Sequence, residues 1–330
     1  MIDFVGRRRW FYLISLLCIL PGVISLILPD GFRRGIEFSS GTTFSARFEA
    51  PVGTDAMRTA LGELGHPDAR VQQTQAGRVL VRTDLIEGAS SAPPIGPAPP
   101  SEREDLETAL QARFGPLLDG EGNEINRFLE FASVSSSVSS DIGRDAAIAV
   151  VAAAVAILIY VTISFISVPS PVRYGAGAVV ALGHDVLIVL GVSSILGRIF
   201  DFEIDTLFIT AMLTIVGFSV HDTIVVFDRI RENVRRAEGA GLDVTLGDAV
   251  NSSLNQTIGR SLNTSITLLL VLVALILMGG DTIRDFLIVM LIGTISGTYS
   301  SIFIAAQMLV SWDEGDLPHV FEREAAESPA

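Results

Sequence analysis

The sequence predicts a polytopic α-helical membrane protein with six transmembrane helices and a small α+β domain outside the membrane. Of its 330 residues, 49% are hydrophobic and only 18% are charged, whereas a soluble domain carries about 25% charged residues. The apolar residues are gathered in blocks of about 20, the length of a helix that crosses a bilayer. One long interval, residues 29–145, contains no such block, so we expect it to fold outside the membrane.

The predicted membrane spans are six apolar blocks, at approximately residues 10–28, 146–168, 174–196, 206–227, 258–278 and 286–310. The first block follows Arg7, Arg8 and Arg9. It is too long for the core of a signal peptide and no small-residue cleavage site follows it, so we expect it to be retained. The expected domains are a first span within 1–28, an outer domain of 29–145, a five-span bundle of 146–310 and a tail of 311–330.

The distribution of arginine predicts the orientation, because short cytoplasmic loops carry an excess of basic residues. With the N-terminus inside, the short outer loops hold only Arg198 and Arg284, beside several acidic residues. The reversed topology would place most arginines of the membrane part outside. We therefore expect both termini in the cytoplasm and residues 29–145 on the outer side of a cytoplasmic membrane.

The order of elements expected within 29–145 is that of the ferredoxin-like, split β-α-β motif. The expected elements, in chain order, are a strand at 42–48, a helix at 56–64, a hairpin at 70–82, a helix at 101–114 and a strand at 127–134. We find no cluster of catalytic residues in this interval, so it is expected to be a binding module.

Local signals set the boundaries of these elements. Asp55 is expected to cap the first helix, and Ser101 with Glu104 matches a capping box at the start of the second. The turn of the hairpin is expected at residues 75–77, where a glycine occurs. The interval 88–100 is rich in Ser, Pro and Gly and is expected to be an exposed insertion.

The charge and the cysteine content exclude several kinds of protein. A formal net charge of −14 argues against nucleic-acid binding, which requires a basic surface. The single cysteine, Cys18, lies inside an apolar block, so neither an intrachain disulfide nor a thiolate metal cluster is expected. The sequence contains no lysine, which excludes a Walker-type phosphate lysine and a Schiff base. We expect no cofactor and no metal site.

Asp222 is the strongest functional candidate inside the membrane, where charged side chains are costly and therefore tend to be functional. Apolar turns precede and follow it in the fourth span. A rise of about 1.5 Å per residue places it in the inner half of that span, away from the lipid head groups. Ser219 and Thr223 are expected to be supporting polar residues. The alternative is a structural carboxylate held by serine or threonine hydroxyls.

The approach to the fifth span combines polar and apolar faces, because residues four apart form rows on a helix. The polar rows contain Asn251, Asn255, Arg260, Asn263 and Thr264. We expect Arg260 to be buried and to face Asp222, so that a change in their separation takes up and releases a proton. The alternative is an arginine that extends to the lipid head groups as a membrane anchor.

Other polar and small residues in the spans suggest supporting roles. His184 and Asp185 lie at the middle of the third span and are expected either to join a relay or to form a helix-to-helix hydrogen bond. His221 adjoins Asp222 in sequence but lies about 100° away around the helix, so direct pairing is not implied. Gly293 and Gly297 form a small-xxx-small pattern that favours helix packing, and the alanine-rich second span suggests the same.

Three stretches of the sequence form specific motifs, GFSVHDTIVVFDRIREN at 217–233, NSSLNQTIGRSLNTSIT at 251–267 and GIEFSSGT at 35–42, and His184-Asp185 adds a polar pair in the third span. In these motifs, and over nearly its whole length, the chain resembles the SecF family, the smaller partner of the bacterial SecD–SecF protein-export complex. The stretch 217–233 is the most specific part of the resemblance. The departures from the family pattern are His221 in place of Asn, Glu37 in place of Asp, Ser40 in place of Gly and Gly259 in place of Ser. None of them removes Asp222 or Arg260.

The resemblance implies an RND-superfamily fold and a non-enzymatic role in a bacterial cytoplasmic membrane, in contact with membrane lipid. It implies a complex with SecD, association with the SecYEG translocon and often YajC, and late-stage export of preproteins driven by protons or sodium ions. It also implies that Asp222 and Arg260 belong to the ion-coupling site, which a carboxylate of SecD completes. The outer domain is then expected to handle the emerging preprotein.

Three other classes of function are weighed against this reading. A small-molecule, proton-coupled RND-like exporter usually carries duplicated six-span halves, and this sequence has no internal repeat. An intramembrane protease needs a Ser–Lys pair, paired aspartates or a metal, and the sequence has neither lysine nor an HExxH motif. A structural scaffold predicts that Asp222→Asn leaves export intact. The choice between protons and sodium ions and the preprotein-binding residues stay open.

Overall fold

The computed structural model describes residues 2–29, 31–73, 77–86, 101–168, 170–200, 202–280 and 283–316. The chain divides into two compact units, one formed by Met1–Arg33 with Ala147–Ala330 and the other by Arg34–Ala146. The expected outer domain, 29–145, corresponds most nearly to the second unit. Residues 75–76 of the turn predicted at 75–77, and the predicted insertion at 88–100, lie outside the described residues.

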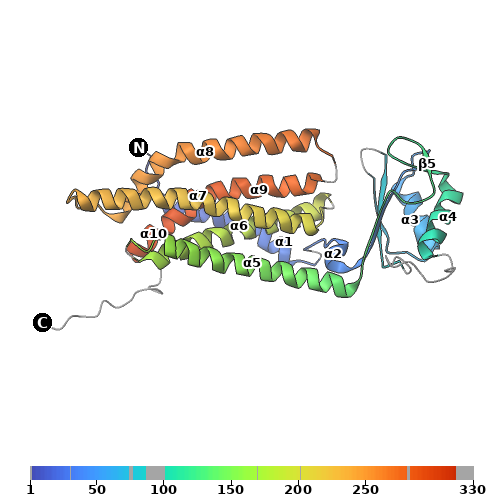
Figure 1. Cartoon of the computed structure of the whole chain (residues 1–330), viewed down its shortest axis with the longest axis horizontal. Helices are drawn as coiled ribbons and strands as arrows, with labels where there is room; N and C mark the ends of the chain where they lie inside the picture. Colours follow the sequence, from blue (N-terminus) through green and yellow to red (C-terminus); the bar gives the residue numbers. More distant parts are fainter. Residues whose placement is uncertain are drawn as a thin grey trace. The chain divides into compact units, whose positions relative to one another are not determined.

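Six helices of the described chain are long and apolar enough to cross a membrane, as the sequence predicts (Figure 1). They are α1 (Arg8–Ile27), α5 (Ser136–Ser164), α6 (Pro171–Phe200), α7 (Thr206–Gly239), α8 (Leu246–Met278) and Arg284–Asp313. The last consists of α9 (Arg284–Ser300), a π-helical turn η2 (Ser301–Ala305) and α10 (Ala306–Asp313). Several helices exceed the predicted spans, because apolar blocks mark only the length inside hydrocarbon.

The centre of the membrane unit is formed by α6, α7 and the last spanning helix. In the most apolar stretch of each helix, 67% of the residues of the last helix and 50% of those of α7 are buried. The corresponding share is 17% for α8 and 6% for α5. The expectation that the alanine-rich α5 packs closely is therefore wrong for most of its length in this chain. The end of α5 contributes Val161 to the core, and Phe165, which directly follows the helix, belongs to it as well. An alanine side chain buries little area, so a high alanine content does not show that a span packs against another helix.

Glycines allow the closest helix approaches in the membrane unit. A Cβ atom on Gly293 of α9 would lie 2.7 Å from Ile215 Cγ2 of α7, and one on Gly297 would lie 3.0 Å from Ser219 Cβ. The predicted small-xxx-small face thus meets α7. A second approach, which sequence analysis did not single out, joins α1 and α6, where a Cβ on Gly22 would lie 2.6 Å from the Cα of Gly191.

The second unit contains a four-stranded antiparallel sheet in the order β2-β3-β1-β6, which is the ferredoxin-like arrangement that the sequence predicts. Its strands are β1 (Gly41–Ala46), β2 (Arg70–Gln73), β3 (Val79–Thr83) and β6 (Glu130–Val134). Phe44 of β1 is opposite Val81 of β3 and Phe131 of β6. Its fully buried ring belongs to the core shared with the helices α3 (Thr54–Glu63) and α4 (Glu102–Phe114).

The helix starts of this unit test the predicted caps. The capping box at Ser101 is present, since the Glu104 amide donates to Ser101 Oγ at 3.3 Å and the Ser101 amide donates to Glu104 Oε2 at 3.4 Å. The predicted cap at Asp55 is wrong. The helix begins at Thr54, two residues before the predicted start, and Asp55 lies in its first turn, where it pairs with Arg58 at 2.8 Å.

Three short elements were not expected. They are α2 (Ile36–Ser39), β4 (Leu117–Leu118) and β5 (Glu124–Ile125), the last two paired as a hairpin. The helix has four residues and each strand has two, too few for hydrophobic periodicity to be read from the sequence.

Candidate functional site

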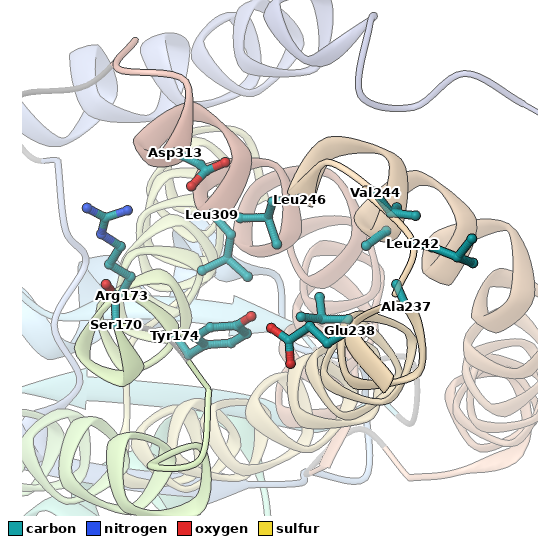
Figure 2. Close-up of a pocket in the computed structure, with 12 residues that line it drawn as sticks. Ser170, Arg173, Tyr174, Ala237, Glu238, Leu242, Val244, Leu246, Leu309 and Asp313 are labelled. Atoms are coloured by element: carbon teal, nitrogen blue, oxygen red, sulfur yellow. The ribbon is translucent and has the colours of Figure 1, made fainter. Parts of the chain in front are cut away.

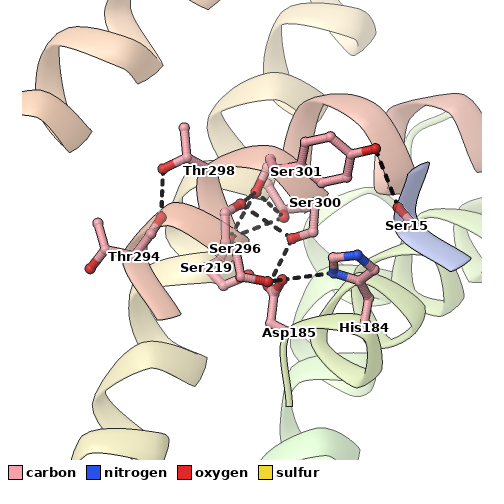
Figure 3. A network of polar contacts seen from close by, with 12 residues as sticks. Ser15, His184, Asp185, Ser219, Thr294, Ser296, Thr298, Ser300 and Ser301 are labelled. Carbon is pink, nitrogen blue, oxygen red and sulfur yellow. Dashed lines mark hydrogen bonds and ion pairs between the residues drawn. The ribbon is translucent and has the colours of Figure 1, made fainter. Parts of the chain in front are cut away.

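Asp185 of α6 is the centre of a buried polar cluster (Figure 3). Its Oδ2 accepts hydrogen bonds from Ser219 Oγ at 2.6 Å and Ser300 Oγ at 2.7 Å, and its Oδ1 accepts one from Ser296 Oγ at 2.6 Å. His184 Nδ1 lies 3.0 Å from the same Oδ1. Bonds to a carboxylate are short and strong, so this one side chain holds α6, α7 and α9 together.

The spacing on α9 explains why the serines converge. Ser296 and Ser300 are four residues apart and therefore lie in one row of the helix. The adjacent Gly297 leaves room for Ser219 of α7, whose Cβ would otherwise meet a side chain at 3.0 Å. The predicted packing face and the Asp185 cluster are thus parts of one arrangement. The glycine brings α7 near enough for its serine to reach a carboxylate on α6.

The cluster continues from Ser219 toward the π-helical turn. Thr223 Oγ1 donates to the Ser219 carbonyl oxygen at 3.0 Å and lies 2.9 Å from Ser301 Oγ. Ser301 Oγ in turn donates to the Gly297 carbonyl oxygen at 2.8 Å. Single π-helical turns inside α-helices occur frequently at functional sites, and this one begins where the polar cluster ends.

His184 connects the cluster to α1. Its ring stacks on Tyr299 with centroids 5.8 Å apart. The Tyr299 hydroxyl donates to the Phe11 carbonyl oxygen at 2.8 Å and accepts a bond from Ser15 Oγ at 3.3 Å. Among the described residues, His184 Nε2 is buried and has no hydrogen-bond partner.

Within the described part of the membrane unit, Asp222 is the second buried carboxylate, and its surroundings differ from those of Asp185. Its side chain is held by Ser261 of α8, whose Oγ donates to Oδ1 at 2.8 Å. Its other oxygen, Oδ2, is buried and has no hydrogen-bond partner among the described residues. His221 is exposed, in keeping with its expected direction away from Asp222. The bundle therefore holds one fully bonded carboxylate and one half-bonded carboxylate.

Ser219 and Thr223, expected to support Asp222, instead serve the Asp185 cluster. Ser219 precedes Asp222 by three residues, so the two side chains leave α7 about 60° apart. Ser219 faces Asp185 of α6 and Gly297 of α9, and Asp222 faces α8. Nothing in the local sequence distinguishes these two directions.

Arg260 does not take the buried position expected for it in this chain. It is exposed, and within the described residues no ion pair joins it to Asp222. The residue that reaches Asp222 is its neighbour Ser261, because consecutive side chains lie about 100° apart on a helix. The buried row of α8 consists of small hydroxyl residues, Ser253, Thr257, Ser261 and Ser265. Their four-residue spacing, a signal of helix packing in membranes, would have identified this face.

The other polar residues of α8 divide into two groups. Asn251 and Asn255 bind the main chain of the N-terminal segment, with Phe4 N donating to Asn251 Oδ1 at 2.8 Å. Asn263 and Thr264 are exposed. None of these four side chains forms a hydrogen bond to Asp222 within the described part of the chain.

A cavity of about 300 Å³ lies elsewhere in the membrane unit, between α6, α7, α8 and α10. Tyr174, Glu238 and Asp313 are among the residues that surround it (Figure 2). Neither Asp185 nor Asp222 lines it. Among the described residues, no group of three or more His, Cys, Asp or Glu side chains is placed to hold a metal ion.

The fold and the polar centre define a multispan helical membrane protein with ionisable groups buried in its bundle, a feature that marks ion or substrate pathways. The family model described as protein export membrane protein SecD/SecF, C-terminal, matches residues 120–315. The protein translocase subunit SecF of Thermobaculum terrenum is 43% identical over the full length of both chains. That of Anaerolinea thermophila is 36% identical, again over 100% of both. The chain belongs to the SecD/SecF family of protein export membrane proteins.

A solved structure shares the fold. The crystal structure of SecDF, a translocon-associated membrane protein from Thermus thermophilus, matches with a TM-score of 0.74 and 32% identity. The match covers 95% of this chain and 39% of that chain. A SecDF structure in a super-membrane-facing form matches with a TM-score of 0.62 and 29% identity. This chain thus spans well under half of the SecDF chains that it matches.

Proposed function

We propose that this protein is an accessory subunit of the protein translocase, of the SecF kind, and that it uses a flow of protons or sodium ions to drive late preprotein translocation. Family membership and the names of its full-length relatives support the translocase role. The half-bonded carboxylate of Asp222 is the observation that supports ion coupling. In this proposal the protein catalyses no covalent chemistry.

The coupling step begins at Asp222. An ionised carboxylate in a hydrocarbon environment is costly, and Oδ2 of Asp222 lacks a partner that would offset this cost. A proton or sodium ion arriving from the outer side neutralises the charge and weakens the bond that Ser261 donates to Oδ1. Because that bond joins α7 to α8, its loss allows the two helices to shift, and release of the ion to the inner side restores it.

Arg260 enters this mechanism through a second subunit. It is exposed in this chain, on a helix whose apolar part is also largely exposed. A partner that covers α8 would bury the guanidinium and could bring a further carboxylate to it. SecD is the proposed partner, and the SecDF chain, of which this protein matches 39%, supports that assignment.

The energy available from ions is sufficient for such a movement. One elementary charge crossing 100 mV supplies about 2.3 kcal/mol. A two-state element with a gap of a few kcal/mol is therefore biased by one or a few ions. No nucleotide is required, and the second unit would change position as the helices shift.

The proposed setting is the bacterial cytoplasmic membrane with both termini in the cytoplasm and residues 29–145 on the outer side. The arginine distribution supports this orientation. Association with SecYEG and YajC, and contact of the second unit with translocating preproteins, belong to the same proposal.

Export of a preprotein into membrane vesicles tests the coupling, with wild type, Asp222→Asn and the control Asp228→Asn. Asp228 lies on the same helix but is exposed. Each variant is assayed with a proton gradient, with a sodium gradient and with neither. We expect Asp222→Asn alone to lose the gradient-dependent part of export. Full retention of that part in Asp222→Asn would show that the carboxylate is structural and refute the coupling role.

A further inference from the structure

The N-terminal strap, residues 2–7, is held by two asparagines at the start of α8. Ile2 N donates to Asn255 Oδ1 at 2.9 Å, and Asn255 Nδ2 donates back to the Ile2 carbonyl oxygen at 2.8 Å. Phe4 N donates to Asn251 Oδ1 at 2.8 Å. All three bonds use the main chain of the strap. Its side chains contribute separately.

The geometry suits recognition of a main chain. Two residues four apart on a helix are about 6 Å apart along its axis. Ile2 and Phe4 are two residues apart in the strap, and their amides meet Asn255 and Asn251, respectively. The Ile2 side chain is 56% exposed, so its identity has little part in the contact.

The strap also connects α8 to the far end of the last helix. The Phe4 side chain is 3% exposed and belongs to the aromatic and aliphatic core of the membrane unit. Its ring lies 6.0 Å from that of Phe303. Arg8, directly after the strap, forms ion pairs with Glu314 and Asp316. The strap is thus anchored on the bundle and reaches α8 through the two asparagines.

The two helices beside Asp222 are unequally fixed. On α7, Ser219 is bonded to Asp185 at 2.6 Å and Thr223 lies 2.9 Å from Ser301. On α8, only 17% of the most apolar window is buried. Its side-chain contacts near the site are those of Ser261 with Asp222 and of Ser265 with Thr298 at 2.6 Å. Nearer its start, Ser253 Oγ accepts a hydrogen bond from Asn233 Nδ2 of α7 at 2.8 Å, and Gln256 Oε1 accepts one from Arg229 Nε at 2.5 Å. The start of α8 is thus held by α7 as well as by the strap, while the apolar part of α8 is the less buried of the two helices.

We infer that Asn251 and Asn255 are positioning residues for the Asp222 site. By holding the strap they add to the bonds that Ser253 and Gln256 form with α7, and together these contacts fix the start of α8 and keep Ser261 against Asp222. Asn255 and Ser261 are about 9 Å apart along one continuous helix, so a displacement at one is carried to the other. The inference rests on the proposed ion-coupling function, because it assigns a second determinant to the same site.

A spin label tests the contact itself. The full chain carries Cys18→Ser and Ile2→Cys, with a nitroxide on the new cysteine, and is measured in lipid vesicles. Because Ile2 is exposed and only its main chain is held, we expect a spectrum of restricted motion that Asn255→Ala shifts to higher mobility. Asn263→Ala, at an exposed position two turns further along the same row, should leave the spectrum unchanged. An unchanged spectrum in Asn255→Ala would overturn the inference.

Gradient-driven export tests the positioning role, with Asp222→Asn as the reference. Ile2→Pro removes the amide that donates to Asn255, whereas Ile2→Ala keeps it. We expect Asn255→Ala and Ile2→Pro to lose gradient-dependent export at wild-type membrane levels, and Ile2→Ala to keep it. If Asp222→Asn loses this export but both strap variants keep it, positioning is overturned and the coupling function stands. If Asp222→Asn keeps it, both proposals fail.

Discussion

Replacing Asp185 by alanine is expected to destabilise the membrane unit far more than replacing Asp222. The two carboxylates are a matched pair, because both are buried and both lie inside spanning helices. They differ in the bonds they accept from other helices. Asp185 accepts three from serine hydroxyls of α7 and α9, and Asp222 accepts one from Ser261 of α8. The volume removed is the same, so the cavity contribution largely cancels in the comparison.

The magnitude follows from the number of interhelical bonds. Such bonds in membranes average about 0.6 kcal/mol and reach about 1.7 kcal/mol. The three bonds of Asp185 therefore contribute about 2 to 5 kcal/mol by the same scale. Ser219 and Ser296 would be left buried without an acceptor, which places Asp185→Ala toward the upper end. Asp222→Ala is expected to cost no more than about 1.7 kcal/mol, because it also removes a carboxylate oxygen that has no partner among the described residues.

Reversible unfolding in mixed micelles measures the difference. Each variant is titrated with sodium dodecyl sulfate and followed by circular dichroism, which gives the free energy of unfolding. An Asp185→Ala value within about 0.5 kcal/mol of wild type, the range of ordinary surface substitutions, would refute the reasoning. Equal losses in Asp185→Ala and Asp222→Ala would refute it as well, because the count of accepted bonds would then not determine stability.

Two further predictions concern packing and pH. Gly293→Ala introduces a Cβ that would lie 2.7 Å from Ile215 Cγ2, and it is expected to lower the free energy of unfolding by about 1–3 kcal/mol, the usual cost of overpacking. Adding Ile215→Ala should restore part of this loss in the same micelle titration, and no recovery would contradict the assigned contact. In the second unit, hydrogen bonds from the Asn123 side chain and from main-chain amides hold the pKa of the Asp119 carboxyl below its ordinary value. A lowered pKa stabilises the folded state at pH values above the pKa of the unfolded chain, which is about 3.9 for aspartate. This stabilisation is lost as the pH falls through the lower pKa of the folded state. Thermal unfolding of the full chain should therefore show a loss of stability on acidification below about pH 4 that Asn123→Ala reduces, and identical pH profiles would contradict this assignment.

The predictions that succeeded depend on local chemistry. Hydrocarbon excludes unpaired backbone polar groups, so a spanning segment must be a continuous apolar helix, and its length can be read directly from the sequence. The capping box at Ser101 is equally local, since its two hydrogen bonds join residues three apart. The strand order of the second unit followed from the order of elements, because few topologies satisfy the rules of chain connection.

The predictions that failed concern side chains on helices that have more than one polar row. The sequence of α8 places Arg260 and Ser261 side by side, and either could face α7. Packing selects Ser261, because a small hydroxyl residue allows the helices to approach and a guanidinium does not. On α7, packing likewise decides that Ser219 and Asp222 face different neighbouring helices.

The sequence by itself determined the membrane class, the six spans, the ferredoxin-like unit and the identity of the buried carboxylates, because each depends on composition or on neighbours within a few residues. Only the tertiary structure decided which partners those carboxylates have. Asp185 receives serines from positions 34, 111 and 115 residues away in the chain, and the Asn255 contact spans 253 residues. Such pairings depend on the rotation and mutual distance of whole helices, and these are set by packing between segments that are remote in sequence.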